Sequence, residues 1–328
     1  MRRAAALFAR WEALLLVFLA AAFAFGAGTS PYFLAVSNIS IAVAGAMPGA
    51  IVALAMTLVI VTGEIDISVG SITGLCAAVM ALCLERGLPI AAAMPFGFAA
   101  GTLAGLLNGA LVAYAGLPSL VVTIGTLALY RGVAQIMLEE RGVSNFPEWY
   151  QSIGFGTIAG TPVPWCLLIF GVLFIGFAVF LHGTHWGRSL FAIGNNREAA
   201  RFSGIDVGRS ILGVFATSGA MCSVAAVVLT AYLASARADT ATGLELPVIT
   251  AVVLGGVNIF GGSGTMGGVL IAVFVLAFVQ NALGLAGVTP EEQQIVTGAV
   301  LIATLVLFRA SGLVRARVAA PRRSRKAG

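Results

Sequence analysis

The chain has 328 residues, of which 59% are hydrophobic and 9% charged, and its mean hydropathy is +1.03. A water-soluble globular chain carries about 25% charged residues, so this composition excludes a soluble fold and indicates an all-α, polytopic membrane protein. Much of the net charge of +5 comes from the two ends of the chain. We attribute it to cytoplasmic termini beside anionic lipid and not to nucleic-acid binding.

The hydrophobic segments predict a bundle of about ten transmembrane helices, taking roughly 20 apolar residues as one crossing. With this number, both termini fall on one face of the membrane, together with a long polar segment in the middle of the chain. The excess of arginine in these parts independently predicts that this face is cytoplasmic. The predicted crossings are 14–25, 41–62, 71–84, 90–114, 119–138, 164–182, 211–233, 246–259, 266–285 and 294–308.

The first interruption of the apolar pattern is the segment 63–70, GEIDISVG, which places Glu64 and Asp66 between two hydrophobic runs. Ionisable groups in a membrane are costly unless they line water or find partners, so both are candidates for a transport pathway. They also suit a small cytoplasmic turn in which Ser68 and Ser71 cap the next helix. We favour the structural role over direct substrate contact, and both interpretations stay open here.

A second glycine-rich interruption, residues 255–268, occupies the corresponding place in the other half of the chain and contains Asn258. Paired breaks of this kind in a transporter indicate discontinuous helices around a central pathway. Asn108 is a further polar candidate inside a predicted span, although such amides more often bond neighbouring helices than a substrate. The pathway candidates are Glu64, Asp66, Ser68, Asn108 and Asn258.

Three glycines in the predicted span 90–114 recur at four-residue spacing. They are Gly97, Gly101 and Gly105. A face of small residues lets two helix backbones approach closely in lipid. The spacing therefore predicts a close-packed helix pair.

The central polar segment, residues 184–208, is long enough to require water on one face of the membrane. Within it, Asn196 is a suitable N-cap and Glu198 lies near the positive end of a helix. The pattern predicts a short helix over 196–202, which Gly204 ends. Such a helix suits insertion into a groove of a soluble partner. The alternative is an ordinary basic loop that only fixes topology.

Motifs for catalysis are absent from the sequence. It has no G-x-x-x-x-G-K-[ST] phosphate loop, so the chain is not itself an ATPase, and no nucleophile and base stand out as a pair. The cysteines lie in apolar runs without the spacing of metal ligands, so we expect packed thiols, no metal site and no cofactor. They are Cys76, Cys83, Cys166 and Cys222.

Four motifs, in this order, resemble the ribose-type (monosaccharide) permeases of bacterial ABC importers, in the family of inner-membrane components of binding-protein-dependent transport systems. They are GEIDISVG at 63–70, LPSLVVTIGT at 117–126, GRSLFAIGNNREAA at 187–200 continued by SGI at 203–205, and ITAVVLGGVNIFGGSG at 249–264. The resemblance covers nearly the whole chain. It implies one permease domain over residues 1–328, embedded in the lipid bilayer of a bacterial inner membrane.

The resemblance also implies partners and a site. A second permease copy or paralogue, a cytoplasmic ATPase with tandem nucleotide-binding domains and a periplasmic sugar-binding protein are expected. Residues 184–208 then form a cytoplasmic coupling loop that contacts the ATPase. Its expected coupling residues are Gly194, Asn195, Asn196, Glu198, Ala199, Ala200 and Gly204. The resemblance does not choose among ribose, xylose, arabinose, galactose, rhamnose and a furanosyl signalling molecule.

Two other kinds of transporter stay open. A branched-chain amino acid permease shares the broad architecture, although the motifs at 63–70 and 187–200 favour sugar. A secondary transporter would use Glu64 or Asp66 as its ion or proton site. Dependence on ATP, as opposed to collapse of transport by an ionophore, separates the secondary transporter from the importers.

Overall fold

The computed structural model describes residues 2–139 and 141–319, and these residues form thirteen helices and no β-strand. The all-α prediction is confirmed. The helices are α1 Arg2–Thr29, α2 Val36–Val61, α3 Val69–Glu85, α4 Ile90–Ala113, α5 Ser119–Leu138, α6 Glu148–Phe155, α7 Trp165–Gly183, α8 His185–Asn195, α9 Arg197–Phe202, α10 Val207–Leu233, α11 Glu245–Leu254, α12 Met266–Leu285 and α13 Pro290–Ala319.

Seven helices in the described part of the chain are long and apolar enough to cross a bilayer, namely α1, α2, α4, α5, α7, α10 and α12. The polytopic bundle is therefore confirmed. Two of the other predicted crossings correspond to the shorter apolar helices α3 and α11. The last predicted crossing, 294–308, lies in α13 and extends into residues whose side chains are not described.

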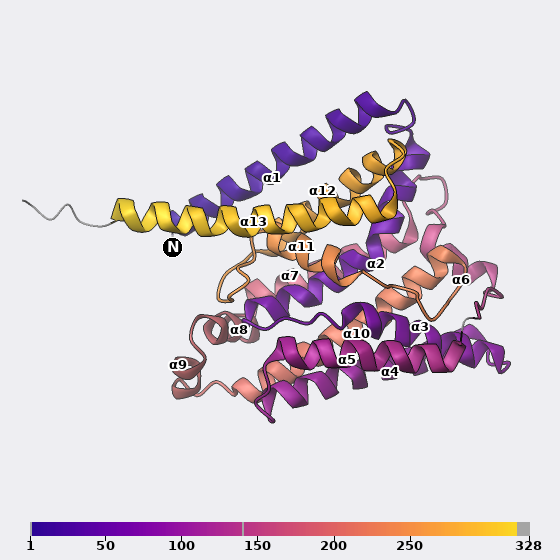
Figure 1. Ribbon diagram of the computed structural model, residues 1–328, viewed down its shortest axis with the longest axis horizontal. Coiled ribbons are helices and arrows are strands. Elements are labelled where there is room, and N and C mark those ends of the chain that lie inside the picture. The colour runs from indigo at the N-terminus through magenta and orange to yellow at the C-terminus, as the bar shows by residue number, and fades with distance from the viewer. Residues whose placement is uncertain (1, 140, 320–328) are drawn as a thin grey trace, which may run out of the picture.

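The two ends of the bundle carry different short helices (Figure 1). We call the end that carries α8 and α9 the inner end, and the end that carries α6 the outer end. The start of α1 and the far end of α13 both lie at the inner end (Figure 1). The predicted cytoplasmic C-terminus includes residues 320–328, which lie outside the described residues.

Helix α2 forms the centre of the bundle and packs against α7, α10, α11 and α12. Its 26 residues include no charged side chain, and the run from Ala50 to Val61 is entirely buried. A helix that is hydrophobic on all sides is typical of such a surrounded position. The sequence of α2 therefore accounts for its place at the core.

Helices α4 and α10 cross at a glycine contact, as the spacing predicts. A methyl group on Gly101 would overlap the Ser223 hydroxyl of α10, and one on Gly105 would overlap the Phe215 carbonyl. Gly219 of α10 faces the same crossing, where any side chain would collide with the backbone of α4. Backbone contact at this closeness requires glycine on both helices.

Three predicted boundaries need correction. The connection between the predicted crossings 119–138 and 164–182, which we call the outer loop, contains the helix α6, which begins after Pro147. The polar segment forms α8 before the predicted short helix. The crossing predicted at 246–259 ends as α11 at Leu254, because Gly256 adopts a φ of +89° that a right-handed helix does not accommodate. Helices α6 and α8 were missed because short amphipathic helices lack the long apolar run on which the prediction rests.

Candidate functional site

The two glycine-rich interruptions meet in space at the inner end. The Gly262 N–H donates to the Val61 carbonyl at 2.9 Å, and a methyl group on Gly261 would lie only 2.8 Å from the Gly63 nitrogen. Residues about 200 positions apart in the sequence therefore form one contact. Glycine is required there because the two backbones approach each other closely. We call this contact, with the parts of α5, α8 and α9 that bond to it, the inner junction.

Helix α8 is attached to the inner junction by its last residues. Asn195 Nδ2 donates to the Gly262 carbonyl at 3.1 Å. Gly194 lies so close to the Val61 carbonyl that no side chain would fit there. Two of the expected coupling residues therefore hold the end of α8 against both interruptions.

Helix α9 confirms the short helix predicted over 196–202. The Asn196 side chain caps it by accepting from the Ala199 N–H at 2.9 Å. Gly204 follows with a φ of +81°, as the predicted helix end requires. Of the helix itself, only Ala200 is buried, so α9 projects from the inner end and Glu198 is exposed (Figure 1).

Phe202 at the end of α9 is 92% exposed, the most exposed large apolar side chain of the described residues. An aromatic ring held in water on a short, rigid helix is typical of a surface that another protein covers. The sequence analysis did not single out Phe202. The feature of the sequence that could have identified it is an aromatic residue inside an otherwise polar segment.

Glu64 pairs with the projecting helix. Arg197, the first residue of α9, donates through Nη2 to the Glu64 carboxylate. The Glu64 side chain is only 10% exposed, whereas that of Arg197 is 42% exposed. The ion pair therefore joins the interruption after α2 directly to α9.

Asp66 is fully buried and lies in a polar network between four helices. Its Oδ1 accepts from the Ser68 hydroxyl at 2.6 Å and the Ser68 N–H at 3.0 Å, and its Oδ2 accepts from Ser218 of α10 at 3.1 Å. Asn108 of α4 donates to the Ser68 hydroxyl at 2.8 Å and accepts from Tyr130 of α5 at 3.1 Å. These bonds link α3, α4, α5 and α10.

The predicted capping of α3 by serine side chains is wrong. Ser68 occupies the N-cap position, but its hydroxyl donates to Asp66 and makes no cap hydrogen bond. The Ser71 hydroxyl donates back to the Ser68 carbonyl at 2.8 Å. The Ser68 hydroxyl oxygen, which a cap would use as its acceptor, accepts from Asn108 instead, and the Ser68 backbone is helical and not extended as at a side-chain cap.

Asn258 is not part of this network. Its side chain closes its own turn, donating to the Gly261 carbonyl at 3.0 Å and accepting from the Phe260 N–H at 3.2 Å. This is an Asx turn, for which Asn is a preferred residue. Asn258 therefore shapes the second interruption locally.

The motif at 117–126 also reaches the inner junction. Ser119 Oγ accepts from the Ile65 N–H at 3.1 Å, and the Thr123 hydroxyl lies 3.4 Å from the Ile65 carbonyl. These side chains satisfy backbone groups in the non-helical stretch between α2 and α3. All four motifs that carry the family resemblance thus converge at one place.

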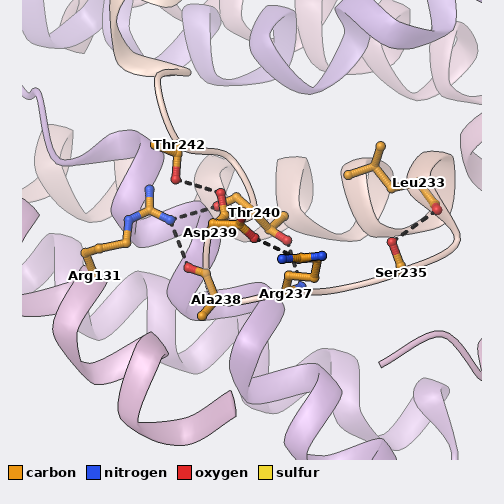
Figure 2. A network of polar contacts seen from close by, with 8 residues as sticks. All are labelled: Arg131, Leu233, Ser235, Arg237, Ala238, Asp239, Thr240 and Thr242. Atoms are coloured by element: carbon orange, nitrogen blue, oxygen red, sulfur yellow. Dashed lines mark hydrogen bonds and ion pairs between the residues drawn. The ribbon is translucent and has the colours of Figure 1, made fainter. Parts of the chain in front are cut away.

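A second polar cluster lies at the outer end and was not singled out from the sequence. Arg131 of α5 reaches the segment between α10 and α11, where its Nη1 donates to the carbonyls of Ala238 at 3.0 Å and Thr240 at 3.1 Å (Figure 2). In the same segment, Arg237 pairs with Asp239 at 3.2 Å. The feature of the sequence that could have identified this cluster is Arg131, a lone charged residue inside the apolar run 119–138.

The seven long apolar helices and the buried polar groups between them define a polytopic helical membrane protein. Residues 38–305 match the family described as branched-chain amino acid transport system / permease component, and the chain belongs to this family. It is a multi-pass inner-membrane permease subunit of an ABC importer and not an enzyme. The ATPase and the periplasmic binding protein are separate partners.

Among curated proteins, the chain is similar to the autoinducer 2 import system permease proteins LsrD. The protein from Photorhabdus temperata is 39% identical over 262 residues, which cover 78% of each chain. The protein from Yersinia enterocolitica serotype O:8 / biotype 1B is likewise 39% identical over 262 residues, with the same coverage. No solved structure matches this chain.

Proposed function

We propose that this permease imports a monosaccharide or a sugar-like furanosyl molecule, driven by ATP hydrolysis in its partner. The supporting observation is the inner junction, where the exposed helix α9 is bonded to the first interruption of the bundle and the end of α8 to the second. The four motifs that support sugar as the substrate class all contribute to this junction. Relatives at 39% identity are named as importers of autoinducer 2, which agrees with a small oxygen-rich substrate.

In this proposal, residues 184–208 form the coupling loop and α9 is the helix that enters a groove of the ATPase. Glu198, Ala199 and Phe202 are exposed and suit contact with the partner. Gly194 and Asn195 instead anchor α8 to the inner junction. The proposed division is between residues that touch the ATPase and residues that carry its movement into the bundle.

The proposed mechanism is alternating access. Two permeases pair as identical copies or paralogues, and closure of the two nucleotide-binding domains on ATP draws their α9 helices together. The Arg197–Glu64 pair carries this displacement to the interruption after α2. Asp66 then passes it to α10 through Ser218. Because packed interfaces have discrete arrangements, such a shift can switch the bundle between two states.

The proposed topology has ten crossings, formed by the seven long apolar helices together with α3, α11 and α13, in one domain. Both termini and α9 then face the cytoplasm. Support comes from the shared position of the start of α1, the far end of α13 and α9 at the inner end (Figure 1). The arginine content of the same parts favours the cytoplasmic face.

Uptake into proteoliposomes tests the proposed function. The vesicles contain this permease, its ATPase and its binding protein, and the radiolabelled panel comprises pentoses, hexoses, deoxyhexoses and branched-chain amino acids. We expect concentrative uptake of a sugar only with ATP inside. Uptake driven by an ion gradient without ATP would contradict the proposal.

Glu198→Arg tests the coupling helix. We expect this variant to insert normally and to lose ATP-driven uptake, because the reversed charge lies on the exposed surface that the ATPase covers. Glu291→Arg, which reverses a charge in the first turn of α13 at the outer end, is the control and keeps its uptake. Normal uptake by Glu198→Arg would remove α9 from the coupling assignment.

The second candidate substrate class is branched-chain amino acids, which the description of the matching family names. ATP-dependent uptake of leucine, isoleucine or valine, without uptake of any sugar, would favour it.

A further inference from the structure

A polar cavity opens at the outer end, at a distance from the inner junction. Its volume is about 640 Å³, and its lining comprises Gln135, Glu139, Arg237, Ala238 and Asp239. Small-molecule sites in proteins commonly have volumes of about 300–1,000 Å³, so a monosaccharide fits within it. Apart from Ala238, each lining residue offers a charged or amide group.

The segment between α10 and α11 forms one wall of this cavity and then enters the bundle. Ala236 is paired with Val143 of the outer loop by backbone hydrogen bonds of 2.8 and 2.9 Å. Further along, a methyl group on Gly74 of α3 would lie 2.8 Å from the Thr240 carbonyl. The segment thus runs from the outer surface to the side of α3.

Arg131 lies beside this cavity and is bonded to its wall, without being one of the residues that line it. It is one helical turn further into the bundle than the lining residue Gln135, and its guanidinium donates to Ala238, which also lines the cavity (Figure 2). Among the described residues, only its Nη1 makes hydrogen bonds. A guanidinium carries five N–H donors, so most of them are left for another acceptor.

Glu245, the first residue of α11, lies against the same face of α3. A methyl group on Gly70 would overlap its carboxylate, and one on Gly74 would lie 3.1 Å from the Arg131 guanidinium. These two glycines are one turn apart, about 6 Å along the helix. No hydrogen bond or ion pair of the Glu245 carboxylate occurs within the described ranges, so a donor and an acceptor lie near each other without pairing.

We infer that the outer cavity receives a polyhydroxylated substrate and that Arg131 and Glu245 bind its hydroxyl groups. This inference rests on the proposed function and adds the residues that recognise the substrate. A sugar hydroxyl both donates and accepts, so neighbouring hydroxyls can accept from the free N–H groups of Arg131 and donate to Glu245. The substrate then bonds to two half-buried charged groups for which the described residues supply no ion pair.

The cavity favours a sugar over a branched-chain amino acid. A zwitterion could place its carboxylate on Arg131 and its ammonium on Glu245. Its branched side chain would then need apolar surface, which binding sites provide to apolar groups. Ala238 is the one apolar lining residue and the other four end in charged or amide groups, so the lining suits hydroxyl groups better than an isoleucine or leucine side chain.

Deoxy-sugars test this inference in the complete transporter. ATP-driven uptake of the imported sugar from the panel of D-ribose, D-xylose, L-arabinose, D-galactose and L-rhamnose is compared with uptake of each of its mono-deoxy analogues. The ratio of the two rates is measured for the wild type and for Glu245→Gln. Because the binding protein is the same in both, a change in this ratio reports contact between sugar and permease.

We expect Glu245→Gln to lower uptake of the sugar and to reduce the discrimination against one deoxy analogue by about fivefold, the effect of one lost hydrogen bond. Glu85→Gln, at an outer-end carboxylate that pairs with Arg141 at 3.9 Å, is the control and keeps the wild-type ratios. If Glu245→Gln does not insert, Gln135→Leu on the exposed face of α5 provides the same comparison.

The inference would be overturned if Glu245→Gln shows the wild-type ratio of uptake rates for every deoxy analogue, whether or not its uptake is slower. Glu245 would then have a structural role. The inference would also be overturned if the wild type imports branched-chain amino acids and Glu245→Gln abolishes only the uptake of these amino acids. If the wild type imports neither any of these sugars nor the furanosyl signalling molecule with ATP, the proposed function itself has failed. ATP-driven sugar uptake with unchanged ratios contradicts only the inference.

Discussion

Glu64 and Asp66 lie two positions apart in the sequence and meet different surroundings. Glu64 pairs with a half-exposed arginine on α9, whereas Asp66 is fully buried and accepts from serine groups. The sequence analysis favoured a structural role for both, and each carboxylate has a partner within the protein. The identity of those partners could not be read from the sequence, because Arg197 and Ser218 are far along the chain.

Reversing the charges of the Arg197–Glu64 pair tests its part in coupling. We expect Arg197→Glu alone to reduce ATP-driven uptake about fivefold or more, since it places a second carboxylate beside the mostly buried Glu64, at a cost of about 1–3 kcal/mol. Arg197→Glu combined with Glu64→Arg restores the pair and recovers much of the uptake. The measurement is the initial uptake rate, normalised to inserted protein.

The matched control is Arg141→Gln, which removes two pairs, with Glu85 and Glu139, whose arginine is 57% exposed. Exposed pairs contribute at most about 1 kcal/mol, so its uptake stays close to that of the wild type. If the single reversal at Arg197 is equally neutral, the pair carries no displacement from α9 and is only a surface ion pair.

At the scale of elements, the apolar pattern predicts the positions of most long helices, and the glycine spacing in α4 predicts its close contact. The sequence did not predict that the four motifs meet at one place. Each motif specifies its own turn or helix end, whereas contacts such as Gly262 with Val61 depend on how α2, α8 and α11 pack. Arg131 was missed for a related reason, because its carbonyl partners lie more than 100 positions away.

Gly105→Ala tests the crossing of α4 and α10. We expect a loss of about 1–3 kcal/mol in stability, the usual cost of overpacking, because the methyl group overlaps the Phe215 carbonyl of α10. The measurement is thermal unfolding of the detergent-solubilised protein, which should show a lower midpoint. Both helices must shift, since the obstructing atom belongs to the backbone.

Gly132→Ala in α5 is the control for this crossing. No atom lies within 4 Å of the position that its methyl group would take, and alanine favours a helix over glycine by about 1 kcal/mol. Its unfolding midpoint should equal or exceed that of the wild type. Equal midpoints for the two alanine variants would show that the α4–α10 contact tolerates extra volume.

At the scale of the whole molecule, the bundle has one polar site at each end. The inner junction joins α9 to the buried Glu64. The outer cavity lies beside Arg131, which is next to α3, as is Glu245 of α11. Helix α3 lies between the two sites: its preceding residues belong to the inner junction, and its glycines face the outer site. A displacement of α3 would therefore alter both ends.

The proposed orientation can be checked by cysteine labelling. In intact cells, a membrane-impermeant maleimide should label Thr161→Cys, in the exposed connection between α6 and α7, and leave Ser203→Cys, after α9, unlabelled until the membrane is opened. Cys83→Ser is the background, because the other native cysteines are buried. Labelling of Ser203→Cys in intact cells would invert the orientation.

The bond between Asp66 and Ser218 has a consequence for biosynthesis. The two residues are 152 positions apart, so a ribosome adding about 5–20 residues per second makes the serine roughly 8–30 s after the aspartate. During that interval, the non-helical stretch before α3 lacks its α10 partner and is unsuited to lipid. The nascent chain must therefore hold this stretch in water or within the insertion machinery, and the first half of the bundle matures only after α10 emerges.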